Sequence, residues 1–244
     1  MTAGTAYAAD VTIFDDFESY AEGTGTLGQG IWSTWDGDPA VDGIISTEQA
    51  ASGAKSLKIR ADNDVIGELR QDKGTCEFSV KVFVPSDHVG TSYVILMNEY
   101  NVGVAYKWST QIELTGTATI GEAGGTLPLV LDAWSDIKIV INLTANKKSI
   151  YYNGALLGSE VAFTGDGAVK LAVVDLYGGG GSSPVYFDDV TLVDTTPPKG
   201  RWTGVMSGVG DRFNDDVGFR GASAAVDGFE PGMAVSGVGG DIWG

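Results

Sequence analysis

The sequence predicts an all-β protein, a two-sheet antiparallel β-sandwich of the jelly-roll kind with a glycine-rich C-terminal extension. Short apolar or alternating segments follow one another closely, and none carries the 3.6-residue repeat of an amphipathic helix. The chain contains 36 glycines, roughly twice the usual ~7% share, which indicates many turns. Many short strands joined by turns favour a sandwich over a parallel α/β sheet.

Two stretches carry the clearest strand signals. Ile137, Ile139 and Ile141 alternate with other residues and therefore share one face of a strand. Asn153-Gly154 is typical of a type I′ turn and predicts a hairpin. The two longest central strands are expected at 93–100 and 104–114. The full expected set of strands is 11–18, 41–47, 56–60, 67–71, 75–84, 93–100, 104–114, 137–143, 149–153, 155–157, 169–177 and 185–193.

The predicted domain boundaries follow changes in composition. Residues 1–10 are small and polar and indicate an N-terminal arm, and the sandwich is expected over 11–194. Pro197 and Pro198 end the strand pattern and begin an extension over 195–244. The extension is rich in glycine but carries aromatic residues such as Trp202 and Trp243, which are uncommon in pure linkers. It could pack on its own sandwich or on a neighbouring subunit, and we favour the neighbour.

Composition excludes several function classes. The 32 acidic and 15 basic residues give a net charge of −17, and such a surface repels the phosphates of nucleic acids. Cys76 is the one cysteine and His88 the one histidine, so a disulfide, Cys/His catalysis and a Cys/His zinc site are not expected. Cys76 shares phase with Phe78 and Val80 and is expected to be buried.

No membrane insertion is expected, because no run approaches the ~20 apolar residues of a spanning helix. Residues 6–10 resemble the end of a signal peptide, but no basic region or long apolar segment precedes them. We expect an extracellular or particle-surface protein, and if Met1 is native, release by lysis or assembly fits better than classical export.

Two similar stretches lie near the two ends of the predicted sandwich. Residues 13–18 and 185–190 each place an aromatic residue directly before two aspartates in a strand-like run. Carboxylates within an apolar strand are costly unless something pairs with them or binds them. We therefore expect the first and last strands to lie side by side, where these residues could hold a cation.

Several motifs together resemble a known superfamily. They are Phe-Asp-Asp-Phe-Glu-Ser-Tyr at 14–20, Ser-Gly-Ala-Lys-Ser-Leu at 52–57, Trp-Ser-Asp-Ile-Lys-Ile-Val-Ile at 134–141, Tyr-Tyr-Asn-Gly at 151–154 and Val-Tyr-Phe-Asp-Asp-Val-Thr-Leu at 185–192. They are similar to the concanavalin A-like, laminin-G-like jelly-roll superfamily and to bacterial carbohydrate-binding modules. The resemblance covers about residues 11–194, and that fold hosts lectins, glycanases, adhesion domains and structural subunits.

The resemblance implies a structural calcium ion that ties the first strand to the last. The ligands implied by position are Asp16 and Glu18, with Asp188 or Asp189. Calcium takes six to eight oxygen ligands, which clustered carboxylates and backbone carbonyls supply. The alternative is that these carboxylates accept hydrogen bonds from backbone N–H groups and bind no metal.

The resemblance also implies a glycan-binding sheet face, where aromatic rings stack on sugars and polar groups bind hydroxyls. The residues expected there are Asn98, Tyr100, Tyr106, Trp108 and Asp175. Tyr106 and Trp108 share phase with Ile112, however, so they could instead be core residues. For Trp32 and Trp35, both a core position and an exposed stacking platform fit the sequence.

The sequence predicts that the protein is not an enzyme. Laminarinase-like members of the superfamily carry their catalytic acids as Glu-x-Asp-x-x-Glu on one strand, and no such stretch is present. The first functional hypothesis is a non-catalytic module that binds polysaccharide or cell-surface glycans or mediates adhesion. The second is a structural subunit of an assembled particle, such as a virus decoration protein or surface filament, whose residues 196–244 dock on neighbouring subunits.

Overall fold

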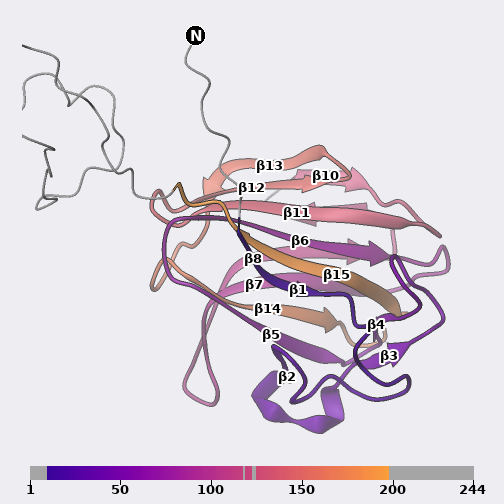
Figure 1. Cartoon of the computed structure of the whole chain (residues 1–244). Coiled ribbons are helices and arrows are strands. Elements are labelled where there is room, and N and C mark those ends of the chain that lie inside the picture. Colours follow the sequence, from indigo (N-terminus) through magenta and orange to yellow (C-terminus); the bar gives the residue numbers. More distant parts are fainter. Residues whose placement is uncertain (1–9, 118, 123–124, 198–244) are drawn as a thin grey trace, which may run out of the picture. The chain divides into compact units, whose positions relative to one another are not determined.

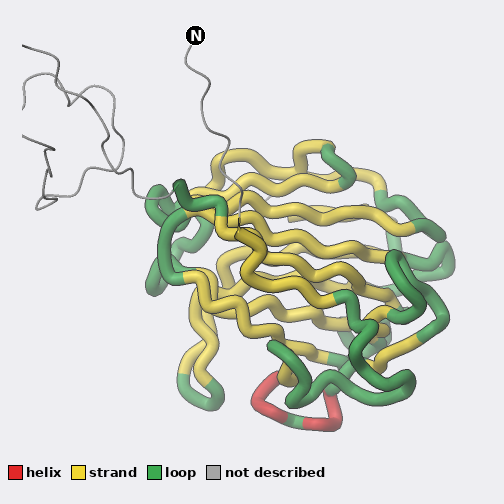
Figure 2. The backbone as a smooth tube through the Cα atoms, in the orientation of Figure 1, coloured by secondary structure: helices red, strands yellow, loops and turns green. Residues whose placement is uncertain are grey.

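The computed structural model describes residues 10–117, 119–122 and 125–197, which form an antiparallel two-sheet β-sandwich (Figures 1 and 2). The N-terminal arm up to residue 9 and the extension from residue 198 lie outside the described residues. The fold class predicted from the sequence is therefore confirmed. No helix among the described residues is long and apolar enough to cross a membrane.

Each sheet is described by its strand order. The first sheet runs β13 (Ala155–Ala162), β12 (Lys147–Tyr152), β11 (Trp134–Asn142), β6 (Thr75–Phe83), β15 (Val185–Asp194), β4 (Ser56–Ile59), β3 (Ile44–Ser46), and β1 (Asp10–Asp15) also pairs with β15. The second sheet runs β10 (Gly125–Pro128), β9 (Thr119–Glu122), β8 (Ala105–Thr115), β7 (Thr91–Asn101), β14 (Leu171–Gly178), β5 (Asp64–Gln71), β2 (Trp32–Thr34). Two short 3-10 turns, η1 (Trp35–Gly37) and η2 (Pro39–Val41), follow β2.

The main core lies between the facing sides of the two sheets. Ile137, Ile139 and Ile141 of β11 are fully buried, as their alternation predicts, and they share one cluster with Leu96 of β7 and Ile112 of β8. Each such side chain contributes about 1.5–3 kcal/mol through burial. Cys76 is also buried in this core, as expected.

The first and last strands lie side by side, which confirms the expectation from the two Phe-Asp-Asp stretches (Figure 1). β1 pairs antiparallel with β15 from Asp10 opposite Asp194 to Asp15 opposite Val190. The strand ends at Asp15 rather than at residue 18, because Phe17 has a φ of 57° and turns the chain. Phe17 is then buried against Trp32, whose ring centroid lies 5.5 Å away.

Short strands are the main elements that the sequence did not predict. β2, β9 and β10 are three or four residues long, which is too short for alternation to stand out. The predicted hairpin at Asn153-Gly154 is confirmed: both residues have positive φ, 46° and 76°, and they join β12 to β13.

Candidate functional site

The carboxylates where the first and last strands meet hold a neighbouring loop. Glu18 Oε1 accepts hydrogen bonds from the N–H groups of Ala54 and Lys55, at 2.7 and 2.6 Å. Asp188 is fully buried, and its Oδ2 accepts from the N–H groups of Ala51 and Ser52, at 2.7 and 3.2 Å. Charge-assisted hydrogen bonds therefore hold loop 51–55 to Glu18, just after the first strand, and to Asp188 in the last strand.

The other two implied calcium ligands are also engaged locally. Asp189 Oδ1 accepts from the Ser52 hydroxyl at 2.7 Å, and Asp16 Oδ1 accepts from the N–H of Glu18 at 3.2 Å. Burial raises the pKa of Asp188 to about 6, although the N–H groups that it accepts from oppose the shift.

These residues do not fit a calcium site. Among the described residues no three or more Asp, Glu, His or Cys side chains gather where they could hold a metal ion. Calcium requires six to eight oxygens free to face it, whereas oxygens of Glu18 and Asp188 already accept backbone N–H bonds. The backbone N–H bonds of the alternative interpretation are present, and calcium binding itself stays a prediction.

A cleft of about 320 Å³ lies on the outer face of the second sheet, opposite the main core. We call it the aromatic cleft. It is lined by Trp35, Asp64, Tyr93, Ile95, Trp108, Gln111, Asp175 and Tyr177.

Strand register brings these side chains together from distant parts of the sequence. One cross-strand row runs from Glu113 on β8 through Tyr93 on β7 and Tyr177 on β14 to Asp64 on β5. The next row runs from Gln111 through Ile95 to Asp175. Polar groups thus lie beside aromatic rings on a rigid sheet, the usual construction of a small-ligand site.

Two pairs of nearly parallel aromatic rings flank the cleft. Trp35 and Trp108 have centroids 6.2 Å apart with 16° between their planes, and Tyr93 and Tyr177 are 5.6 Å apart with 23° between theirs. Trp108 is 50% exposed. An exposed indole beside other rings is a platform that a flat apolar ligand face can cover.

Tyr100 and Tyr106 hold the turn that carries Trp35. The N–H of Asp36 donates to the Tyr100 hydroxyl at 2.8 Å, and the Tyr106 hydroxyl donates to Asp36 Oδ1 at 2.5 Å. Both tyrosine rings also pack on Trp35, with centroid distances of 5.3 and 4.6 Å. These tyrosines therefore position Trp35 and do not line the cleft.

Asp64 and Asp175 form a carboxyl pair in the floor of the aromatic cleft. Asp175 is only 3% exposed, and Oδ1 of each residue has no hydrogen-bond partner among the described residues. Burial raises the pKa of Asp64 to about 6, while the hydrogen bond with Asp175 opposes that shift. Burial, the Asp64 charge and the same hydrogen bond raise the pKa of Asp175 well above its usual range. Both carboxyl groups therefore keep their protons to a higher pH than an exposed aspartate does.

The structure brings together only part of the predicted glycan site. Trp108 and Asp175 line the cleft, and Tyr100 and Tyr106 support it from behind. Asn98 lies elsewhere: it is fully buried, and its amide donates to the carbonyl oxygens of Asp166 and Ala168, at 2.8 and 3.0 Å.

Sequence reasoning missed Asp64, Tyr93, Gln111 and Tyr177, and left Trp35 open. Tyr177 shares phase with Asp175 on one strand, which is the one signal that the sequence contains for it. Of the two open tryptophans, Trp35 lines the cleft, whereas Trp32 is a core residue whose Nε1 donates to Asp15 at 2.7 Å.

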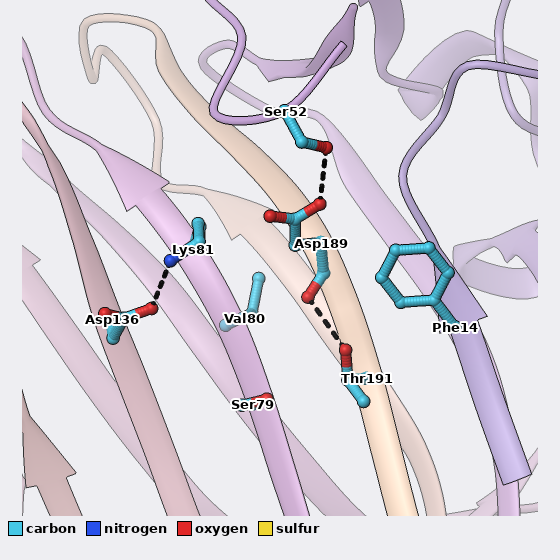
Figure 3. Close-up of a pocket in the computed structure, with 8 residues that line it drawn as sticks. All are labelled: Phe14, Ser52, Ser79, Val80, Lys81, Asp136, Asp189 and Thr191. Atoms are coloured by element: carbon cyan, nitrogen blue, oxygen red, sulfur yellow. Dashed lines mark hydrogen bonds and ion pairs between the residues drawn. The ribbon is translucent and has the colours of Figure 1, made fainter. Parts of the chain in front are cut away.

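A second hollow, of about 420 Å³, lies on the first sheet around Phe14, Ser52 and Asp189 (Figure 3). Its polar groups bind one another: Lys81 pairs with Asp136 at 2.7 Å, and the Thr191 hydroxyl donates to the backbone oxygen of Asp189 at 3.2 Å. It contains one aromatic side chain and no orphaned buried polar atom among the described residues. The aromatic cleft is therefore the better candidate site.

Comparison with known proteins gives structural neighbours only. No protein-family model and no curated protein matches the sequence. A solved sialidase matches with a TM-score of 0.48 and 10% identity, over 72% of this chain and 18% of that one. Trypanosoma rangeli sialidase in complex with 2,3-difluorosialic acid matches with a TM-score of 0.48 and 12% identity, over 68% of this chain and 31% of that one.

The catalytic domain of a glycoside hydrolase family 131 protein from Coprinopsis cinerea matches with a TM-score of 0.45 and 13% identity, over 67% of this chain and 83% of that one. The chain thus spans less than a third of the length of these sialidases. At such identities and TM-scores, these likenesses assign neither a superfamily nor an activity to this chain.

The prediction that the protein is not an enzyme is corrected. It depended on the missing Glu-x-Asp-x-x-Glu motif, which excludes only one arrangement of catalytic acids. Cross-strand register can assemble acidic residues that no local motif reveals, as Asp64 and Asp175 show. The neighbours named above are sialidases and a glycoside hydrolase catalytic domain.

Proposed function

We propose that this protein binds carbohydrate in the aromatic cleft. The observation that carries the proposal is the pairing of parallel aromatic rings with a buried carboxyl pair in the floor between them. Aromatic faces cover the apolar C–H face of a sugar ring, while carboxyl oxygens and the Gln111 amide bind its hydroxyls. The cleft volume of about 320 Å³ lies in the ~300–1,000 Å³ range of small-ligand sites.

Replacing Trp108 with alanine is expected to weaken glycan binding about tenfold or more, because it removes an exposed stacking platform. Affinity electrophoresis through gels containing a panel of polysaccharides measures retention, and assays of released reducing ends on the same panel report any cleavage. Phe14→Ala is the matched control, because Phe14 is a 58% exposed aromatic residue on the first sheet.

Retention of the wild type on no polysaccharide would count against glycan binding. If Trp108→Ala and Phe14→Ala lost retention equally, the aromatic cleft would not be the glycan-binding site. Loss confined to Trp108→Ala supports the proposal.

The functional hypothesis also includes a role in adhesion, a location and an assembly partner. An adhesive role and an extracellular or particle-surface location agree with glycan binding, and we propose them on that basis. The hypothesis of a particle subunit depends on residues 196–244, nearly all outside the described residues, and it remains a prediction.

A further inference from the structure

We propose that the aromatic cleft selects glycans without acidic groups and excludes sialic and uronic acids. This inference rests on the proposed function and names its ligand class. The cleft is lined by the carboxyl pair Asp64 and Asp175 and by no lysine or arginine among the described residues. A sugar carboxylate that entered it would meet fixed acidic groups without a cation to neutralise it.

The negative field extends beyond the lining residues. Glu113 lies at the other end of the row that contains Asp64. The charges of Asp62 and Asp64 act on Tyr177 within the cleft, and the charge of Asp36 acts on Asp64. Asp64 is half-buried, so its charge is less screened than a charge on an open surface.

Lys107, the residue of β8 between Tyr106 and Trp108, is already paired. Lys107 on β8 lies 3.0 Å from Asp166 and 4.0 Å from Glu99. Binding an acidic sugar there would break these contacts. The free acceptors of the carboxyl pair, by contrast, match hydroxyl or ammonium donors: Oδ1 of each residue lacks a partner within the described part of the chain, and Asp175 is 3% exposed.

The test is an immobilised array of neutral, amino, uronic and sialylated glycans, which includes lactose beside sialyllactose as a matched pair. We expect retention on neutral or amino glycans and at least tenfold weaker retention on their acidic counterparts, with a difference that shrinks in high salt. Retention on acidic glycans equal to or above that on neutral ones would overturn this inference and leave the proposed function standing. Retention on no glycan would overturn the proposed function itself.

A charge variant tests whether these acids cause the exclusion. Asp64→Asn with Glu113→Gln removes both acidic ends of one row and is expected to raise the ratio of acidic to neutral glycan binding at least tenfold. Asp136→Asn with Glu77→Gln removes the same formal charge from the first sheet and should leave the ratio unchanged. Equal ratios in the two double variants, with melting curves showing both folded, would overturn the assignment.

Discussion

Replacing Glu122 with glutamine is expected to lower the free energy of unfolding by about 3–5 kcal/mol. Glu122 on β9 pairs with Lys148 on β12 at 2.7 Å, and their side chains are 7% and 4% exposed. Glutamine keeps the shape of glutamate but removes its charge, so the Lys148 ammonium would remain buried without a counter-charge. Burial already lowers the pKa of Lys148 despite the attraction of Glu122.

The location of the pair explains the expected size of the effect. Lys148 lies opposite Ile141 of β11 and points between the sheets, where it also donates to the Ser109 carbonyl oxygen at 2.6 Å and the Thr110 hydroxyl at 2.9 Å. Replacing both charged residues, as in Lys148→Met with Glu122→Leu, is expected to recover most of the loss, because apolar side chains avoid the cost of burying charges.

Urea unfolding at pH 7 measures both variants. Asp136→Asn provides the control, because it breaks an exposed ion pair with Lys81 and should cost at most about 1 kcal/mol. If Glu122→Gln lowered the free energy of unfolding no more than Asp136→Asn does, the buried ion pair would not be needed for stability. A double variant less stable than Glu122→Gln would show that the lysine's hydrogen bonds matter more than the buried charge.

The sandwich was predictable because local patterns encode it. The period-2 alternation around Ile137–Ile141 states directly which side chains face the core, and Asn153-Gly154 specifies its turn through positive φ. The pairing of β1 with β15 could be expected because both contain carboxylates that need partners.

The aromatic cleft was less predictable because bulges and register decide its composition. β7 and β8 shift register around Trp108, which lies opposite Met97 on the outer face, although its phase with Ile112 favours the core. Asp64 and Asp175 meet only because Tyr177 lies opposite Asp64 in the β14–β5 ladder. No spacing within one strand reveals such a pair.

Replacing Asp175 with asparagine is expected to stabilise the protein at pH 7. The pKa of Asp175 is raised well above its usual range in the fold, whereas an unfolded chain loses this proton near pH 4. Between these values the native state binds more protons than the unfolded state, so the free energy of unfolding falls as pH rises. Asparagine mimics the protonated acid at every pH and avoids this loss.

The gain should therefore be present at pH 7 and vanish below about pH 4, where Asp175 is protonated in both states. Thermal unfolding of both proteins across this range measures it. Because Asp64 and Asp188 also have pKa values raised to about 6, the wild type and the variant both keep a slope of the same sign, and the difference between them reports the interacting Asp64–Asp175 pair. A variant less stable than the wild type at pH 7 would contradict the buried, proton-binding carboxyl pair.

Asp175→Asn also separates the effect of this carboxyl group on stability from its effect on glycan binding. An amide in the floor of the cleft would be more stable than a buried acid, so a stabilising substitution there indicates that something other than folding favours the carboxyl group. If the carboxyl pair recognises glycans, Asp175→Asn should gain stability and change glycan retention on the array together. A gain in stability with unchanged retention would show that the Asp175 carboxyl group destabilises the fold without contributing to glycan recognition. Recognition would then depend on the aromatic rings.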